Sequence, residues 1–284
     1  MLLTKDHVQD IIRLALAEDL KTGDVTSEAI FAQKDTTDAR IVAKQEGIYC
    51  GSPMIEYVYS ELDKNIAITV NREEGAPVQP GDTVATISGS TRAILSGERT
   101  VLNFIQRMSG IATRTRHVVD LLQGTGIQIL DTRKTAPGLR IPDKYAVACG
   151  GGTNHRMGLF DMVMIKDNHI RAAGGITAAV EMVRQKHGST YQVEVETTTL
   201  DEVQEAVNAG ADIIMLDNMD TNTMVEAVKS INGRARSEVS GNMDEKKILA
   251  LRNINVDYIS MGGLTHSVTA FDLSMKFGSE LNFG

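Results

Sequence analysis

The sequence predicts an α/β protein whose carboxy-terminal half repeats a β–α unit around a parallel sheet. Its 284 residues suit two domains of about 150 residues or one large α/β barrel. Short apolar runs alternate with amphipathic stretches from residue 127 onwards. Successive runs end at Lys166, Glu196, Asp217, Ser240 and Gly262, with spacings of 30, 21, 23 and 22 residues. This is the period of consecutive β–α units.

The amino-terminal third is predicted to mix helices with strands. Thr4 can cap a helix over 5–17, and residues 18–27 are expected to form a loop. Turns rich in Gly and Pro separate strands expected over 39–43, 66–70 and 83–87. Helical periodicity covers 92–123, where Gly110 is expected to divide two helices and Gly124 to end the second.

In the repeating half, six strands alternate with helices. The strands are expected over 127–130, 162–165, 191–195, 213–216, 235–239 and 258–261, and the helices near 177–187, 200–209, 221–231 and 244–253. Right-handed crossovers place all the strand ends on one face, which carries the active site in α/β barrels. A barrel is favoured over an open sheet. No GxGxxG motif follows a strand, which disfavours dinucleotide binding.

Composition excludes several classes of protein. Hydrophobic residues make up 42% and charged residues 23%, the balance of a globular protein. No run of about 18 apolar residues could span a membrane. Asp6 and Asp10 lie where a signal peptide needs an apolar run. Two cysteines are too few for a disulfide framework, so we expect a reduced, cytoplasmic protein.

The charge distribution predicts a focused anion site. The net charge of −8 argues against a general nucleic-acid or anionic-membrane binder. Residues 131–171 nevertheless carry seven positive and four negative charges. A cationic segment in an acidic protein is typical of a site for a small anion.

Several basic side chains follow the predicted strands. Arg133 and Lys134 follow the first strand of the repeat, and guanidinium groups bind carboxylates and phosphates in bidentate fashion. His155 and Arg156 follow three consecutive glycines, where a flexible loop or a close backbone approach is expected. Lys166, at a strand end, is either a Schiff-base nucleophile or an anion ligand. The neighbouring arginines favour the anion ligand.

Two carboxylates and two glycine loops end the remaining strands. Glu196 and Asp217 could hold Mg²⁺, accept hydrogen bonds from sugar hydroxyls or offset a developing cation. Alternatively, they pair with Lys134 or Lys166 and maintain the shape of the site. The loops beginning at Ser240 and Gly262 resemble the phosphate-binding loops of barrels, where backbone N–H groups surround the anion.

Long motifs of this chain resemble those of the quinolinate phosphoribosyltransferases, also called decarboxylating nicotinate-nucleotide pyrophosphorylases. The central motifs are DTRKTAPGLR (131–140) and DKYAVACGGGTNHRMGLFDMVMIKDNHI (143–170). The resemblance extends along the chain through EDLKTGDVTS (18–27), LSGERTVLNFIQRMSGIATRT (95–115), VEVET (193–197), IIMLDN (213–218), SEVSGN (237–242) and THS with FDLS (265–274).

The resemblance implies an α/β fold with two domains. An N-terminal α/β sandwich, residues 1–107, is joined by a carboxy-terminal return, residues 268–284. An incomplete, seven-stranded α/β barrel of the type II phosphoribosyltransferase kind occupies residues 108–267. The family also implies a homodimer in which the neighbouring subunit completes each site.

The implied reaction joins quinolinate to 5-phosphoribosyl-1-pyrophosphate with Mg²⁺, giving nicotinate mononucleotide, pyrophosphate and CO₂ in NAD biosynthesis. The motifs assign quinolinate binding to Arg133, His155, Arg156 and Lys166, with Arg99 from the partner subunit. They assign the catalytic ribose and pyrophosphate side to Lys134, Glu196 and Asp217, the two acids holding Mg²⁺ directly or through water and pyrophosphate. They assign the 5-phosphate to Ser240, Gly241, Gly262, Gly263 and His266.

Two positions depart from the family pattern. Many relatives have Gly-Gly after the serine of the 240 loop, where this chain has Gly241-Asn242, and Gly-Ala where it has Gly262-Gly263. These changes leave the individual phosphate contacts open. Two other functions remain as alternatives: a Schiff-base lyase or aldolase using Lys166, and a non-catalytic protein that binds a phosphorylated metabolite.

Overall fold

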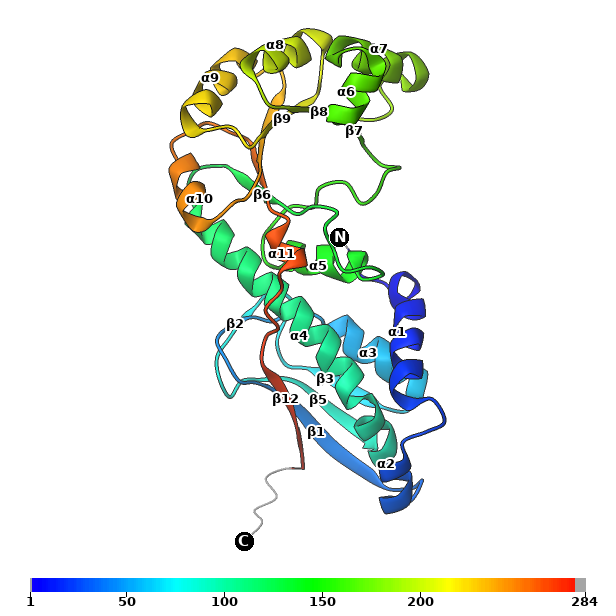
Figure 1. Cartoon of the computed structure of the whole chain (residues 1–284). Helices are drawn as coiled ribbons and strands as arrows, with labels where there is room; N and C mark the ends of the chain where they lie inside the picture. The colour runs from blue at the N-terminus through cyan, green and yellow to red at the C-terminus, as the bar shows by residue number, and fades with distance from the viewer. Residues whose placement is uncertain (1, 279–284) are drawn as a thin grey trace. The chain divides into compact units, whose positions relative to one another are not determined.

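A computed structural model describes residues 2–278 of the chain. The chain divides into two compact units (Figure 1). The first comprises residues 1–116, 135–151 and 265–284, and the second comprises residues 117–134 and 152–264. Residues 279–284, the end of the expected return segment, lie outside the described residues. No helix within residues 2–278 is long and apolar enough to cross a membrane.

The first unit is built on an antiparallel sheet with the strand order β12-β1-β5-β3. Its strands are β1 (Thr36–Ala43), β3 (Ala67–Val70), β5 (Thr83–Ser90) and β12 (Leu273–Phe277), and a separate pair joins β2 (Gly47–Ile48) to β4 (Pro77–Val78). Strand β12 pairs with β1, so the carboxy-terminal return does complete this sheet. Its helices are α1 (Lys5–Leu20), α2 (Val25–Ile30), α3 (Ser52–Leu62), α5 (Arg140–Cys149) and most of α4 (Thr91–Leu121).

The expected helix break at Gly110 is wrong, because α4 continues unbroken through that residue. A side chain at position 110 would collide with the carbonyl oxygen of Thr269, on the segment that leads to β12. The glycine therefore permits close approach of another backbone, and does not end the helix. The expected loop over 18–27 is also corrected: α1 continues to Leu20, and α2 begins after Asp24, whose carboxylate accepts hydrogen bonds from the N–H groups of Thr26 and Ser27.

The second unit is a parallel sheet covered by helices, with the strand order β6-β11-β10-β9-β8-β7. Its strands are β6 (Gln128–Leu130), β7 (Val163–Ile165), β8 (Val193–Thr197), β9 (Ile213–Asp217), β10 (Arg236–Ser240) and β11 (Tyr258–Ser260). Within the described residues this sheet has six strands, and Thr153 adds one isolated parallel bridge to Leu130 beside the edge strand β6.

The helices of this unit are α6 (Asp167–Ala173), α7 (Ile176–His187), α8 (Leu200–Ala209), α9 (Thr221–Ile231) and α10 (Glu245–Leu251), while α11 (Gly263–His266) crosses the boundary between the units. In Figure 1, α6 to α9 follow one another along the outer side of β7, β8 and β9. The bounds of α8 and α9 agree with the sequence prediction. Thr199 and Asp220 cap these helices through their side chains.

Candidate active site

The carboxyl ends of the parallel strands bring the predicted polar residues to one edge of the sheet. Ile165 is paired with Val195, so Lys166 and Glu196 follow at equivalent positions of β7 and β8. Ser240 is paired with Asp217 across β10 and β9. The prediction that these strand ends share one face is therefore confirmed.

Lys166 and Glu196 form a direct ion pair in this edge. The Lys166 Nζ donates to Oε2 of Glu196 at 2.5 Å, and the two side chains are 44% and 17% exposed. The sequence left open whether Glu196 acts on the substrate side or pairs with a lysine. The observed contact is a pairing with Lys166. It also disfavours the Schiff-base alternative, because an amine nucleophile must be uncharged and free to attack.

Asp217 is hydrogen-bonded to Asn218, which was not a predicted site residue. The Asn218 Nδ2 donates to Oδ2 of Asp217 at 2.8 Å, and the Asn218 N–H donates to the Ser240 carbonyl at 3.0 Å. Gly241 has φ of +107°, and a side chain there would collide with the Asn218 amide. The glycine is therefore required by local packing. A Cβ added to Gly263 meets no atom within 4 Å, which leaves room at the end of β11.

Buried Asp131 fixes the segment that carries His155 and Arg156. One carboxylate oxygen of Asp131 accepts from the Asn154 Nδ2 at 2.6 Å, and the other accepts from the His155 N–H at 2.9 Å. Asp131 follows β6 directly, so these bonds tie the NHR motif to the end of that strand. Neither Asp131 nor Asn154 was a predicted site residue.

Arg133 and Arg156 place two positive charges near one another. Burial, and then the charge of Arg133, lower the pKa of the Arg156 guanidinium. Arg156 is oriented by two donations, from Nη1 to the Met162 carbonyl at 3.2 Å and from Nη2 to the Met164 sulfur at 3.6 Å. Two guanidinium groups that repel each other favour a bound dianion, which relieves their repulsion.

His155 lies between two buried carboxylates. Its Nε2 is 2.9 Å from Oε2 of Glu194 and 3.4 Å from Oε2 of Glu238, and both glutamates are fully buried. Burial alone would lower the pKa of His155, but the hydrogen bonds to the two carboxylates raise it to about 9. Burial, followed by the charge of Glu238, raises the pKa of Glu194. The two carboxylates therefore hold His155 as a protonated imidazole whose positive charge they balance.

Glu194 and Glu238 were not predicted as site residues, although the alternation of side chains along a strand points to them. They precede Glu196 and Ser240 by two residues, so strand alternation places each on the same face as its predicted neighbour. Lys134 is exposed at the end of the TRK segment, where its N–H donates to Oγ1 of Thr132 at 3.0 Å.

Two predicted residues belong to the other unit. Arg99 lies on α4 and lines a cavity of about 180 Å³ together with Asp19 and Arg107. His266 ends α11, and its Nδ1 is 2.7 Å from Oγ of Ser267. The second unit by itself therefore contains eleven of the thirteen predicted site residues.

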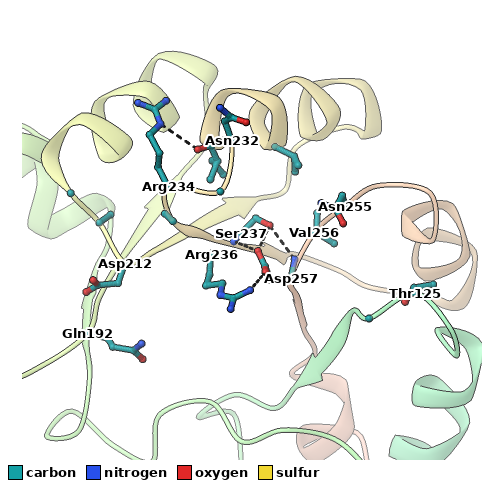
Figure 2. Close-up of a pocket in the computed structure, with 17 residues that line it drawn as sticks. Thr125, Gln192, Asp212, Asn232, Arg234, Arg236, Ser237, Asn255, Val256 and Asp257 are labelled. Atoms are coloured by element: carbon teal, nitrogen blue, oxygen red, sulfur yellow. Dashed lines mark hydrogen bonds and ion pairs between the residues drawn. The ribbon is translucent and has the colours of Figure 1, made fainter.

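A cavity of about 870 Å³ lies at the opposite, amino ends of the strands (Figure 2). Its charged groups engage one another: Arg236 donates to Asp257 at 2.5 Å, and Ser237 donates to the same carboxylate from its N–H and its hydroxyl. Arg234 donates to the carbonyls of Ser230 and Ile231. These bonds lie at the amino ends of the strands, away from the predicted site residues at the carboxyl ends.

Comparison with known proteins identifies the family of this chain. A model of the quinolinate phosphoribosyl transferase C-terminal domain matches residues 111–276, and one of the N-terminal domain matches residues 24–109. The chain belongs to the quinolinate phosphoribosyltransferase family. A probable nicotinate-nucleotide pyrophosphorylase (carboxylating) of Bacillus subtilis is 46% identical over 258 residues, covering 91% of this chain and 89% of the relative. The chloroplastic nicotinate-nucleotide pyrophosphorylase of Arabidopsis thaliana is 45% identical, covering 95% and 83%.

Solved structures of the family have the same fold. NadC from Streptococcus pyogenes has a TM-score of 0.94 at 40% identity, covering 97% of this chain and 98% of that one. The nicotinate-nucleotide pyrophosphorylase of Francisella tularensis has a TM-score of 0.92 at 42% identity, covering 98% of both chains. These similarities confirm the predicted family and the predicted fold of a sandwich joined to an incomplete barrel.

Proposed function

We propose that this chain transfers the phosphoribosyl group of 5-phosphoribosyl-1-pyrophosphate to quinolinate. The products are nicotinate mononucleotide, pyrophosphate and CO₂, in the biosynthesis of NAD. The observation that carries the proposal is the pair of guanidinium groups of Arg133 and Arg156 near the strand ends, with Lys166 and the protonated His155 beside them. Quinolinate is a dianion, and a cluster of this charge offsets the cost of removing two carboxylates from water.

The arrangement of these cations supports the following binding roles. Arg133 and Arg156 bind the quinolinate carboxylates in bidentate fashion, which relieves the repulsion between the guanidinium groups. His155 adds a protonated imidazole that Glu194 and Glu238 hold in place. Lys166 exchanges part of its contact with Glu196 for substrate, which frees that carboxylate to face the ribose.

The acids act on the ribose side of the reaction. Loss of pyrophosphate builds positive charge on C1 and the ring oxygen of the ribose, which a wholly cationic site would oppose. Glu196 and Asp217, on adjacent strands, offset this charge in the transition state. Lys134 lies on the pyrophosphate side. The pyridine nitrogen then forms the bond to C1, the 2-carboxylate leaves as CO₂, and C2 of the ring takes up a proton.

Glu196 and Asp217 also suit Mg²⁺, which prefers a few carboxylate oxygens together with substrate phosphate. Each already has a polar partner, Lys166 and Asn218 respectively, so we propose that these acids reach the ion partly through water and pyrophosphate. Bound Mg²⁺ would stabilise charge on the leaving pyrophosphate. The 5-phosphate is assigned to Ser240, Gly241, Gly262, Gly263 and His266.

We further propose a homodimer in the cytoplasm, with Arg99 reaching the site of the neighbouring subunit. Arg99 belongs to the first unit, and it lines a cavity there together with other polar residues. Both cysteines are free thiols, as is usual in a reducing compartment. Neither the dimer nor the compartment is needed for the chemical assignment of the barrel residues.

The proposal is tested by incubating the protein with quinolinate, 5-phosphoribosyl-1-pyrophosphate and Mg²⁺. The expected products are nicotinate mononucleotide with equal amounts of pyrophosphate and CO₂. Nicotinate lacks the 2-carboxylate and should be a poor substrate. Arg156→Ala should abolish quinolinate binding, while Arg234→Ala, at the other end of the strands, should not affect it. Binding of both substrates without release of pyrophosphate would contradict the catalytic role, and efficient use of nicotinate would contradict the choice of acid.

A further inference from the structure

Three side chains of metal-binding type meet in the first unit, which contains none of the proposed Mg²⁺ ligands. Cys50 precedes α3, Glu74 lies between β3 and β4, and Cys149 is the last residue of α5. The two sulfur atoms and a carboxylate oxygen lie within 4.8 Å of one another. The Cys149 thiol donates to Oε2 of Glu74 at 3.7 Å. These are the only two cysteines of the chain, and both are free.

The backbone fixes Glu74 in this position. Its Oε1 accepts from the N–H groups of Gly51 at 3.0 Å and Ser52 at 2.7 Å, and its Oε2 accepts from Gly51 at 2.9 Å. These N–H groups belong to the first turn of α3, whose N-cap Gly51 has no side chain to cap the helix. The carboxylate is therefore oriented before any ligand arrives, in the way that outer-shell hydrogen bonds orient metal ligands.

The loop that carries Glu74 is packed directly on Cys149. The Gly75 N–H donates to the Tyr49 carbonyl at 2.9 Å, and the Tyr49 N–H donates to the Ala76 carbonyl at 3.0 Å. Gly75 has φ of +77°, and an added Cβ would lie 2.8 Å from the Cys149 carbonyl oxygen. Three segments distant in sequence are thus held in register around the two sulfur atoms.

We propose that Cys50, Glu74 and Cys149 form a binding site for a thiophilic divalent cation, with Zn²⁺ as the best match. Two thiolates and one carboxylate are zinc-type ligands, and water would complete the tetrahedron. With Zn–S bonds of about 2.3 Å, the sulfurs of a tetrahedral site lie roughly 3.8 Å apart. The 4.8 Å limit on the present separations requires only a small contraction.

The ionisable groups of Cys50, Glu74 and Cys149 are compatible with a bound divalent cation. Burial raises the pKa of the Cys50 thiol, and neighbouring Cys149 and Glu74 raise it further. Zn²⁺ would replace the thiol protons of both cysteines and so release two protons on binding. Two thiolates, one carboxylate and Zn²⁺ leave a net charge of −1, beside the N–H groups that begin α3.

The surroundings of Cys50 and Cys149 disfavour a disulfide between them. Disulfide formation needs one thiol to ionise and attack, and burial together with the Glu74 carboxylate opposes ionisation of Cys50. The cation and the disulfide make opposite predictions for the number of free thiols, so one experiment separates them.

The test uses the reduced, metal-free full-length protein, titrated with Co²⁺ and then with Zn²⁺ in competition. We expect a near-ultraviolet thiolate-to-Co²⁺ charge-transfer band that saturates at one equivalent and is displaced by Zn²⁺. No other cysteine can give this band. Zn²⁺ should also raise the melting temperature of the protein, since a ligand that binds only the folded state stabilises it.

Variants locate the site. Cys149→Ser, at a partly exposed position, should remove the band and weaken Zn²⁺ binding by more than the 10–100-fold typical of outer-shell changes. Glu74→Gln keeps a carbonyl oxygen to cap α3 but removes the charge, and should weaken binding at least about tenfold. Glu73→Gln, an exposed neighbour, is the matched control and should bind Zn²⁺ normally.

Three results would overturn the proposal: no charge-transfer band from the folded parent protein, unchanged Zn²⁺ affinity in Cys149→Ser, or loss of both free thiols with a mass lower by two hydrogens. The first result requires no variant, so it stands even where a substitution prevents folding. All three are independent of phosphoribosyl transfer.

Discussion

Replacing His155 by glutamine should destabilise the protein by an amount that depends on pH. Glutamine can still donate a hydrogen bond towards Glu194 and Glu238, but it carries no charge. The folded-state pKa of His155 is about 9, against 6.5 for the unfolded side chain. Because the folded value is higher, the stabilisation is complete below pH 6.5 and is lost as pH rises through 9. It amounts to about 3 kcal/mol below pH 6.5 and to slightly less at pH 7.

The assay is thermal unfolding followed by circular dichroism at pH 7 and pH 10. At 2–4 °C per kcal/mol, His155→Gln should melt roughly 5–10 °C below the parent at pH 7 and close to it at pH 10. The double variant His155→Gln/Glu238→Gln should recover part of the deficit at pH 7, because it removes one of two like charges left facing each other in a buried site. Exposed His187→Gln is the control.

Two results would refute this reasoning. An equal deficit at both pH values would mean that His155 contributes packing and not charge. A double variant that is no more stable than His155→Gln would mean that the two glutamates do not repel each other, and the ion-pair account of the cluster would then be wrong.

Three further predictions concern catalysis, assembly and packing. Glu196→Gln and Asp217→Asn should retain quinolinate binding but lower single-turnover rates on the order of 100-fold; lost binding with a normal rate at saturation would contradict the electrostatic role. Mixed Arg99→Ala and Lys166→Ala proteins should recover part of the activity in hybrid dimers. No recovery despite demonstrated subunit exchange would place Arg99 in the site of its own chain. Asp143→Asn breaks a buried, bidentate ion pair with 2.8 Å bonds and should cost about 3–5 kcal/mol, measured by urea unfolding; an unchanged midpoint would contradict this.

Local patterns were sufficient for much of the second unit. Helices α8 and α9 agree with their predicted bounds because capping side chains and apolar periodicity lie within each segment. The predicted strand ends at Asp217 and Ser240 agree, and β8 ends one residue beyond Glu196. Regular β–α units place successive strand ends on the same edge. The family motifs extended this interpretation to the first unit, where the return strand β12 pairs with β1.

The sequence by itself determined the β–α repeat, the cationic residues near the strand ends and the family. The tertiary structure decided which side chains and backbone groups contact one another. A glycine inside a helical pattern is typical of a helix break. The role of Gly110 is instead set by the close approach of the Thr269 carbonyl, from a segment distant in sequence. His155 gains its raised pKa from Glu194 and Glu238, which come from two other strands of the sheet. Periodicity reports the face on which a side chain lies, whereas close approach and burial depend on segments that meet only after folding.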